Sequence, residues 1–151
     1  MIIKTHVAVA IAVAFLFLPA VATNKFIFFA LVVFSTLLPD VDSVSSFLGQ
    51  RSIFRPIQIF TRHRGLLHSF NFAFLISLVL ALFFPLIALP FFLGYFTHLF
   101  VDSFTIEGIR PFWPSEYVVG SVVRTGGKID KMIYFIFVGL DFILFLRLVI
   151  N

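Results

Sequence analysis

The sequence of 151 residues contains no cysteine and few charged residues. Without cysteine the chain forms no disulfide bond, no thiolate zinc site and no iron–sulfur cluster. Charged residues make up only 12% of the chain, about half of the roughly 25% that is usual in soluble domains. A soluble globular enzyme does not fit this composition, and a disordered or coiled-coil protein is excluded.

Apolar residues are present in large excess. They make up 61% of the chain, and 24 residues are phenylalanine, whereas a soluble domain has about 45–50% apolar residues. The net charge of +4 does not require a nucleic-acid partner, because membrane proteins concentrate Lys and Arg on their cytoplasmic side. We therefore expect one membrane-embedded domain over residues 1–151, with the lipid bilayer as its partner and no nucleic acid.

Five apolar segments are candidates for membrane-spanning helices, because a helix needs about 20 apolar residues to cross about 30 Å of hydrocarbon. They are residues 7–22, 26–38, 69–84, 86–101 and 132–150. The first two are short, and the second is either a full crossing or a re-entrant helix. The sequence thus predicts an all-α, multi-pass bundle of about five transmembrane helices.

The start of the chain also has features of a signal peptide. Lys4 precedes an apolar core, and Ala20-Val21-Ala22 has the small-x-small pattern of a cleavage site. We expect it to stay uncleaved, because another apolar segment follows almost at once.

Alternating crossings would distribute the basic residues unevenly between the two sides of the membrane. Lys25 and Arg147 fall on the side of the C-terminus. The side of the N-terminus receives nine: Lys4, Arg51, Arg55, Arg62, Arg64, Arg110, Arg124, Lys128 and Lys131. The positive-inside bias therefore predicts a cytoplasmic N-terminus and an external C-terminus.

The segment 47–60 between the second and third predicted spans mixes Arg51 and Arg55 with apolar residues and is interrupted by Pro56. This pattern is typical of a segment lying in the headgroup layer, such as a broken amphipathic helix. A cap over the helix ends is the alternative, and both can hold.

Histidine and aspartate gather at the ends of the predicted helices on the N-terminal side. The residues concerned are His6, His63, His68, His98, Asp40, Asp42, Asp102 and Asp130. Short loops on the opposite side explain why they are one-sided, but not why they are His and Asp rather than Lys, Glu, Ser or Asn. Imidazole and carboxylate together suit Zn²⁺, Mn²⁺ or Fe²⁺. We predict a metal site for one or two ions, with zinc favoured.

The spacing of these residues adds geometric detail. His98 and Asp102 are four apart and share a helical face. His63 and His68 are five apart and need a turn to point inward together. Asp40 and Asp42 both reach one ion if the chain is extended there, and only one does in a tight turn. The surplus of ligands indicates two ions, or else groups that orient the histidine rings.

Arginine residues flank the same face. Arg64 lies between two of the histidines and Arg110 follows the fourth predicted helix. Arginine binds phosphate through paired hydrogen bonds, so both are candidates for substrate binding. Anchoring to lipid headgroups is the alternative.

The motifs in this order resemble those of the YdjM-like family of inner-membrane, metal-dependent hydrolases, some of them LexA-regulated. They are Thr5-His6, Leu38-Pro39-Asp40-Val41-Asp42, His63-Arg64-Gly65-Leu66-Leu67-His68-Ser69 and the HxxxD run His98-Leu99-Phe100-Val101-Asp102. The resemblance covers nearly the whole chain and implies a helical hydrolase of the inner membrane. Two positions depart from the family pattern: Leu67, where Thr is usual, and Asp130, where a Glu often follows the Thr-Gly turn.

The order of the motifs is also similar to that in zinc-dependent phospholipase C, which favours a phosphoester substrate. The later HxxxE element of those enzymes is absent, so a three-metal site is not expected.

The sequence therefore predicts a metal-dependent hydrolase that acts from the cytoplasmic side on a phosphoester or a lipid headgroup. The expected metal ligands are His6, Asp40, His68, His98 and Asp102. Asp42 or His63 is expected to act as general base or to orient a ligand, and Arg64 and Arg110 to bind substrate. The alternatives are a metal-ion or proton transporter, which the one-sided placement disfavours, and a scaffold in which a metal only staples the helix ends.

Overall fold

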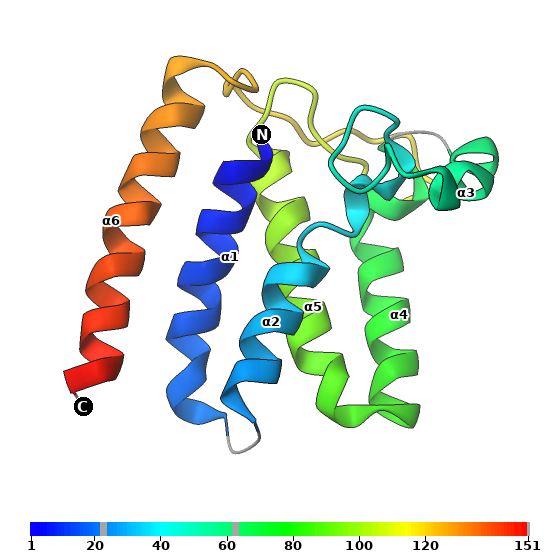
Figure 1. Ribbon diagram of the computed structural model, residues 1–151. Coiled ribbons are helices and arrows are strands. Elements are labelled where there is room, and N and C mark those ends of the chain that lie inside the picture. The colour runs from blue at the N-terminus through cyan, green and yellow to red at the C-terminus, as the bar shows by residue number, and fades with distance from the viewer. Residues whose placement is uncertain (22–23, 62–63, 151) are drawn as a thin grey trace.

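The computed structural model describes residues 1–21, 24–61 and 64–150. Across these residues the chain forms six α-helices and no β-strand, which confirms the predicted all-α class. Five helices stand side by side in a bundle, and the short α3 lies beside one end of it (Figure 1). The helices are α1 (Ile3–Phe17), α2 (Lys25–Ser35), α3 (Arg55–Phe60), α4 (Phe70–Phe83), α5 (Pro85–Ser103) and α6 (Lys128–Ile150). The predicted site residue His63, its neighbour Arg62 and the predicted end of the first span at Ala22 lie outside the described residues.

The predicted count of five membrane crossings is not confirmed by helix length. Among the described residues, three segments are long and apolar enough to cross a membrane: Ile3–Ala20, Pro85–Ser103 and Lys128–Ile150. Helix α4 has 14 residues and α2 only 11, so at 1.5 Å per residue they reach about 21 Å and 17 Å, short of the roughly 30 Å required. Helix α2 gives way to the 3₁₀ turn Pro39–Asp42, and α4 ends just before Pro85.

The connections sort to the two ends of the bundle. The N-terminus, the segment between α2 and α4, and the segment between α5 and α6 gather at one end, here called the N-terminal end (Figure 1). The C-terminus and the α4–α5 turn lie at the opposite end. This arrangement agrees with the predicted alternation of the helices, while the side of the membrane that each end faces stays a prediction.

Helix α5 is the central helix and contacts α1, α2 and α4. Its approach to α2 is close at Gly94, where a Cβ atom would lie 2.1 Å from the carbonyl oxygen of Val32. Only glycine fits there, as is common where helices pack tightly in membranes. Since Gly94 precedes His98 by about one turn, this contact brings the end of α2 against the histidine.

The segment 47–60 combines exposed apolar side chains with an attachment to the bundle, while its location in the headgroup layer stays a prediction. Ile53 and Ile59 are 76% and 78% exposed, as for side chains that insert into a headgroup layer. On α3, the Gln58 amide donates hydrogen bonds to the carbonyl oxygens of Val41 and Gly49, at 2.9 and 2.6 Å. The segment is therefore fastened to the turn that carries Asp40.

Candidate metal centre

The five predicted metal ligands come together at the N-terminal end of the bundle. His6 lies on α1, Asp40 on the turn after α2, His68 on the 3₁₀ turn before α4, and His98 and Asp102 on α5. They form two groups of three whose ligand atoms all lie within 4.8 Å of one another. The first group is His6, His98 and Asp102, and the second is Asp40, His68 and His98. His98 belongs to both, so the groups form one cluster, which we call the His/Asp cluster.

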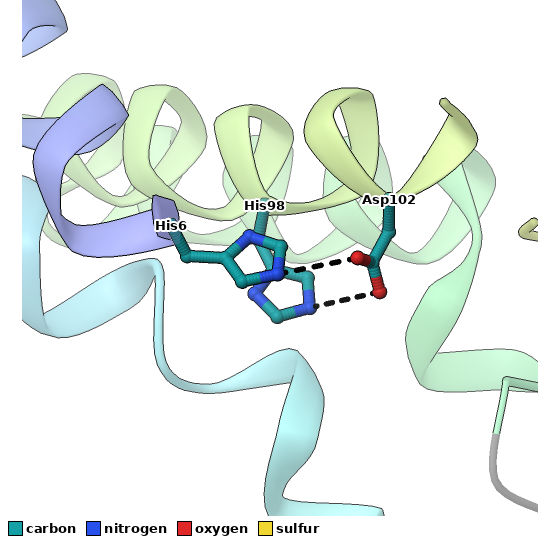
Figure 2. A group of neighbouring side chains, drawn as sticks. All are labelled: His6, His98 and Asp102. Carbon is teal, nitrogen blue, oxygen red and sulfur yellow. Dashed lines mark ion pairs between the residues drawn. The ribbon is translucent and has the colours of Figure 1, made fainter. Parts of the chain in front are cut away.

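The first group joins α1 to α5 (Figure 2). The rings of His6 and His98 stack with their centroids 4.1 Å apart. Both face the Asp102 carboxylate: His6 Nε2 lies 3.2 Å from Oδ1, and His98 Nε2 lies 3.7 Å from Oδ2. One carboxylate thus faces two imidazoles from two helices.

The second group depends on the tight turn Pro39–Asp42. Asp40 Oδ1 lies 3.5 Å from His68 Nε2 and 3.6 Å from His98 Nε2. Asp42 instead faces the other ring nitrogen of His68, with Oδ2 at 3.3 Å from Nδ1. Of the two alternatives left open by the sequence, the tight turn is therefore the one observed, and only Asp40 joins the group.

The geometry of the cluster fits a divalent transition metal. Ligand atoms about 2.05 Å from a tetrahedral zinc ion are about 3.3 Å apart, close to the separations of 3.2–3.7 Å between the ring nitrogens and carboxylates. His98 Nδ1–H donates a hydrogen bond to the Thr36 carbonyl oxygen at 2.7 Å, so the lone pair is on Nε2. That atom is buried and has no hydrogen-bond partner among the described residues. A histidine held this way by a carbonyl is typical of metal ligands.

Charge in the turns beside the cluster pairs an ionised Asp40 with a protonated His68. Burial alone would raise the pKa of Asp40, but the contact with His68 and the charges of His98, His68 and His6 hold that pKa well below its usual range. Burial alone would lower the pKa of His68, but its contacts with Asp40 and Asp42 raise it to about 9. Asp40 therefore stays ionised at neutral pH and His68 stays protonated, so a metal ion that binds His68 has to displace that proton.

Asp130 holds α1 in place and lies outside both groups. Its carboxylate accepts hydrogen bonds from the Ile2 amide at 3.0 Å, the Thr5 hydroxyl at 2.6 Å and the Gly126 amide at 2.8 Å. Thr5 directly precedes His6, so these bonds fix the start of α1 over the cluster. The role left open for Asp130 by the sequence is therefore a positioning role.

Arg64 lies against the cluster, while its predicted role in substrate binding stays a prediction. Its guanidinium group pairs with Asp102 Oδ2 at 3.4 Å and with Glu107 Oε2 at 2.9 Å, and its amide faces Asp42 Oδ2 at 3.3 Å. The residue has a φ of 61°, a left-handed conformation that costs a non-glycine residue free energy and is common at functional sites.

Arg110 has no such placement. It is half-buried and, within the described ranges, forms no ion pair with the cluster. Its predicted role in substrate binding therefore stays a prediction, as does the role of His63.

A polar cleft opens onto the cluster. It has a volume of about 370 Å³, and Asp40, Arg64, Asp102, Glu107 and Ser43 are among the residues that line it. Sequence reasoning missed Glu107, although it is one of only two glutamates in the chain. It also missed Thr36, whose contribution is a backbone carbonyl and leaves no signal in the residue type.

The comparison with known families agrees with these motifs. The model of the YdjM inner membrane protein family matches residues 1–149. The chain belongs to this family. The inner membrane protein YdjM of Escherichia coli (strain K12) is 38% identical over 94 residues, which cover 56% of the chain and 48% of that protein. The protein of the same name from Shigella flexneri matches to the same extent.

The match spans about half the length of these curated relatives. No solved structure matches the chain. The family and its relatives are named for the inner membrane, which confirms the predicted resemblance and the location of this helical protein.

Proposed function

We propose that the protein is a metal-dependent hydrolase of the inner membrane, with the His/Asp cluster as its metal centre and a phosphoester as its substrate. The observation that carries the proposal is the convergence of His6, Asp40, His68, His98 and Asp102 on two overlapping groups within 4.8 Å. These residues come from four separate elements, so their meeting requires the whole fold.

His98, the residue shared by the two groups, limits how many ions the cluster can hold with three protein ligands each. His98 Nε2 has one lone pair and completes either group, but not both at once. One ion is therefore the minimum for the proposed centre, and a second ion would share Asp40 or Asp102 with the first. A bound divalent cation supplies Lewis acidity and makes water a nucleophile near neutral pH.

Arg64 supports a phosphoester as the substrate. Its guanidinium group lines the cleft, where it is paired with the buried Asp102 and with Glu107, whose side chain is 66% exposed. A phosphoryl oxygen that displaces the exposed Glu107 carboxylate would take its place on the guanidinium. In the proposed reaction a water oxygen forms a bond to phosphorus while the bond to the leaving oxygen breaks. A carboxylate of the cleft takes the proton from water and passes it to the leaving oxygen.

Asp42 is better placed to orient a ligand than to act as general base. It is 5% exposed and faces His68 Nδ1, while the opposite nitrogen, Nε2, faces Asp40 and the cluster. A carboxylate on the far nitrogen of a ligating histidine fixes the ring and raises its basicity. We infer that Asp42 acts through His68.

The position of the cluster favours hydrolysis over transport. A carrier binds its ion near the middle of the membrane, with access from both sides. Here the cluster lies at one end of the bundle and opens into a cleft at that end. The cleft also supports an enzyme over a metal-stapled scaffold, because it gives water and substrate a path to Asp40 and Asp102.

Elemental analysis of the purified full chain, combined with an assay on soluble phosphoesters, tests the proposal. We expect about one to two transition-metal ions per chain, and hydrolysis that a chelator abolishes and added Zn²⁺ or Mn²⁺ restores. His98→Ala and Asp102→Ala should lose both metal and hydrolysis. Glu116→Gln, an exposed acidic control, should keep both. Metal retained by both alanine variants would overturn the proposal.

A further inference from the structure

A second cavity lies along the bundle, between α1 and α6. It has a volume of about 440 Å³ and is lined mainly by apolar side chains, including Val7 and Ile11 of α1 and Tyr134 and Val138 of α6. Its volume falls in the range of about 300–1,000 Å³ that is typical of ligand sites. We call it the α1/α6 groove.

The groove adjoins the polar cleft of the metal centre. Ile3 and Phe47 line both hollows, so the two hollows adjoin at these side chains. Lys4 lines the groove on the first turn of α1. From Ile3 to Ile11 the groove follows α1 for about 12 Å, at 1.5 Å per residue.

The order of charge along this path matches a phospholipid. Lys4 lies at the start of the groove, next to the cleft, and would face a phosphate bound there. Arg64 lines the cleft but is paired with Asp102 and Glu107, so Lys4 and the metal ion of the proposed function would supply the positive charge. The apolar lining follows along the helix axis, which is the direction of an acyl chain in a bilayer. Beyond Lys4 the lining of the groove is mainly apolar until Asp141, the last residue of α6 that lines it.

We propose that the substrate is the phosphate monoester of a membrane lipid, with its phosphate in the cleft and one acyl chain in the α1/α6 groove. The proposal rests on the proposed function, because the cluster is the group that would act on the phosphate. It adds the substrate class and assigns Val7, Ile11, Tyr134 and Val138 to chain binding.

Photo-crosslinking of the full chain in phosphatidylcholine nanodiscs tests the groove. The probe is phosphatidic acid with a diazirine in one acyl chain, and phosphatidylcholine with the same diazirine chain reports labelling by bulk lipid. We expect phosphatidic acid to label Ile11 several-fold more than the phosphatidylcholine probe does. Val138→Phe fills the groove and should remove this excess. Val149→Phe, the same change at a site of α6 that is 66% exposed and outside the lining, should keep it.

Metal content and thermal stability, measured on both phenylalanine variants, show whether they are folded. Equal labelling of Ile11 by the two probes, or an excess that Val138→Phe leaves unchanged, would overturn the proposal that the groove binds an acyl chain of the substrate. If a soluble phosphoester is hydrolysed while Ile11 shows no excess, the hydrolase stands and the groove fails. If the excess persists in a protein that binds no metal and shows no hydrolysis, the lipid-binding role of the groove is supported and the proposed hydrolase function is rejected.

Discussion

The hydrogen bond from His98 to the Thr36 carbonyl determines which nitrogen of the central histidine is available. Because Nδ1 donates at 2.7 Å, Nε2 faces the carboxylates of Asp40 and Asp102 with its lone pair. The tautomer is thus fixed by the backbone at the end of α2. At the scale of single residues, the candidate centre therefore depends on a group that no substitution of a side chain removes directly.

Asp42 offers a test at this scale, because it contacts His68 without belonging to either ligand group. Asp42→Asn keeps the size of the side chain and removes its negative charge. Loss of such a supporting carboxylate typically weakens metal binding about 10–100-fold. Competition with a chelator of known affinity measures the change, and Glu116→Gln serves as the control. An affinity equal to that of the unaltered protein would show that Asp42 does not act through His68.

At the scale of elements, close helix packing and short turns position the ligands. Helices α2 and α5 touch at Gly94, one turn before His98. The bonds of Asp130 to Ile2 and Thr5 hold the start of α1. The meeting of His6 with His98 therefore follows from helix contacts that lie outside the cluster.

Gly94→Ala tests the helix contact. The new Cβ would lie 2.1 Å from the Val32 carbonyl oxygen, so α2 and α5 must separate. We expect a loss of about 1–3 kcal/mol in the free energy of unfolding and weaker metal binding, because Thr36 moves away from His98. Gly139→Ala on α6 is the matched control. Nothing lies within 4 Å of its Cβ position, and this change should stabilise the helix by about 0.5–1 kcal/mol.

Thermal unfolding in detergent, followed by circular dichroism, compares the two alanine variants, and chelator competition compares their metal affinity. A Gly94→Ala protein that is as stable as Gly139→Ala and binds metal equally well would contradict the role of the close contact.

At the scale of the whole molecule, the sequence predicts which residues lie at the same end of the bundle better than it predicts helix lengths and the contacts of single side chains. The meeting of His6, His98 and Asp102 at one end of the bundle follows from helix alternation, and the structure confirms it. The length of α2 was not, because it depends on where the turn at Pro39 begins rather than on apolar content. The separate roles of Asp40 and Asp42 depend on that same turn.

The orientation of the bundle is a prediction for the intact protein. The chain has no cysteine, so a single introduced thiol reports on one site. Ser115→Cys, in the exposed connection between α5 and α6, should resist an impermeant maleimide in intact cells or spheroplasts. Ile150→Cys, near the end of α6, should react. Labelling of both from the outside, or of Ser115→Cys alone, would contradict a cytoplasmic N-terminal end and an external C-terminus.

X-ray absorption spectroscopy of the zinc-loaded protein identifies the ligands of the proposed metal centre, because it reports the atoms around the ion. We expect a shell of nitrogen and oxygen atoms at about 2.0–2.2 Å, with imidazole scattering that decreases in His98→Gln, because His98 belongs to both groups, and again when His6→Gln and His68→Gln are added. A shell of oxygen atoms alone, or imidazole scattering unchanged in the triple variant, would contradict a metal centre at the His/Asp cluster.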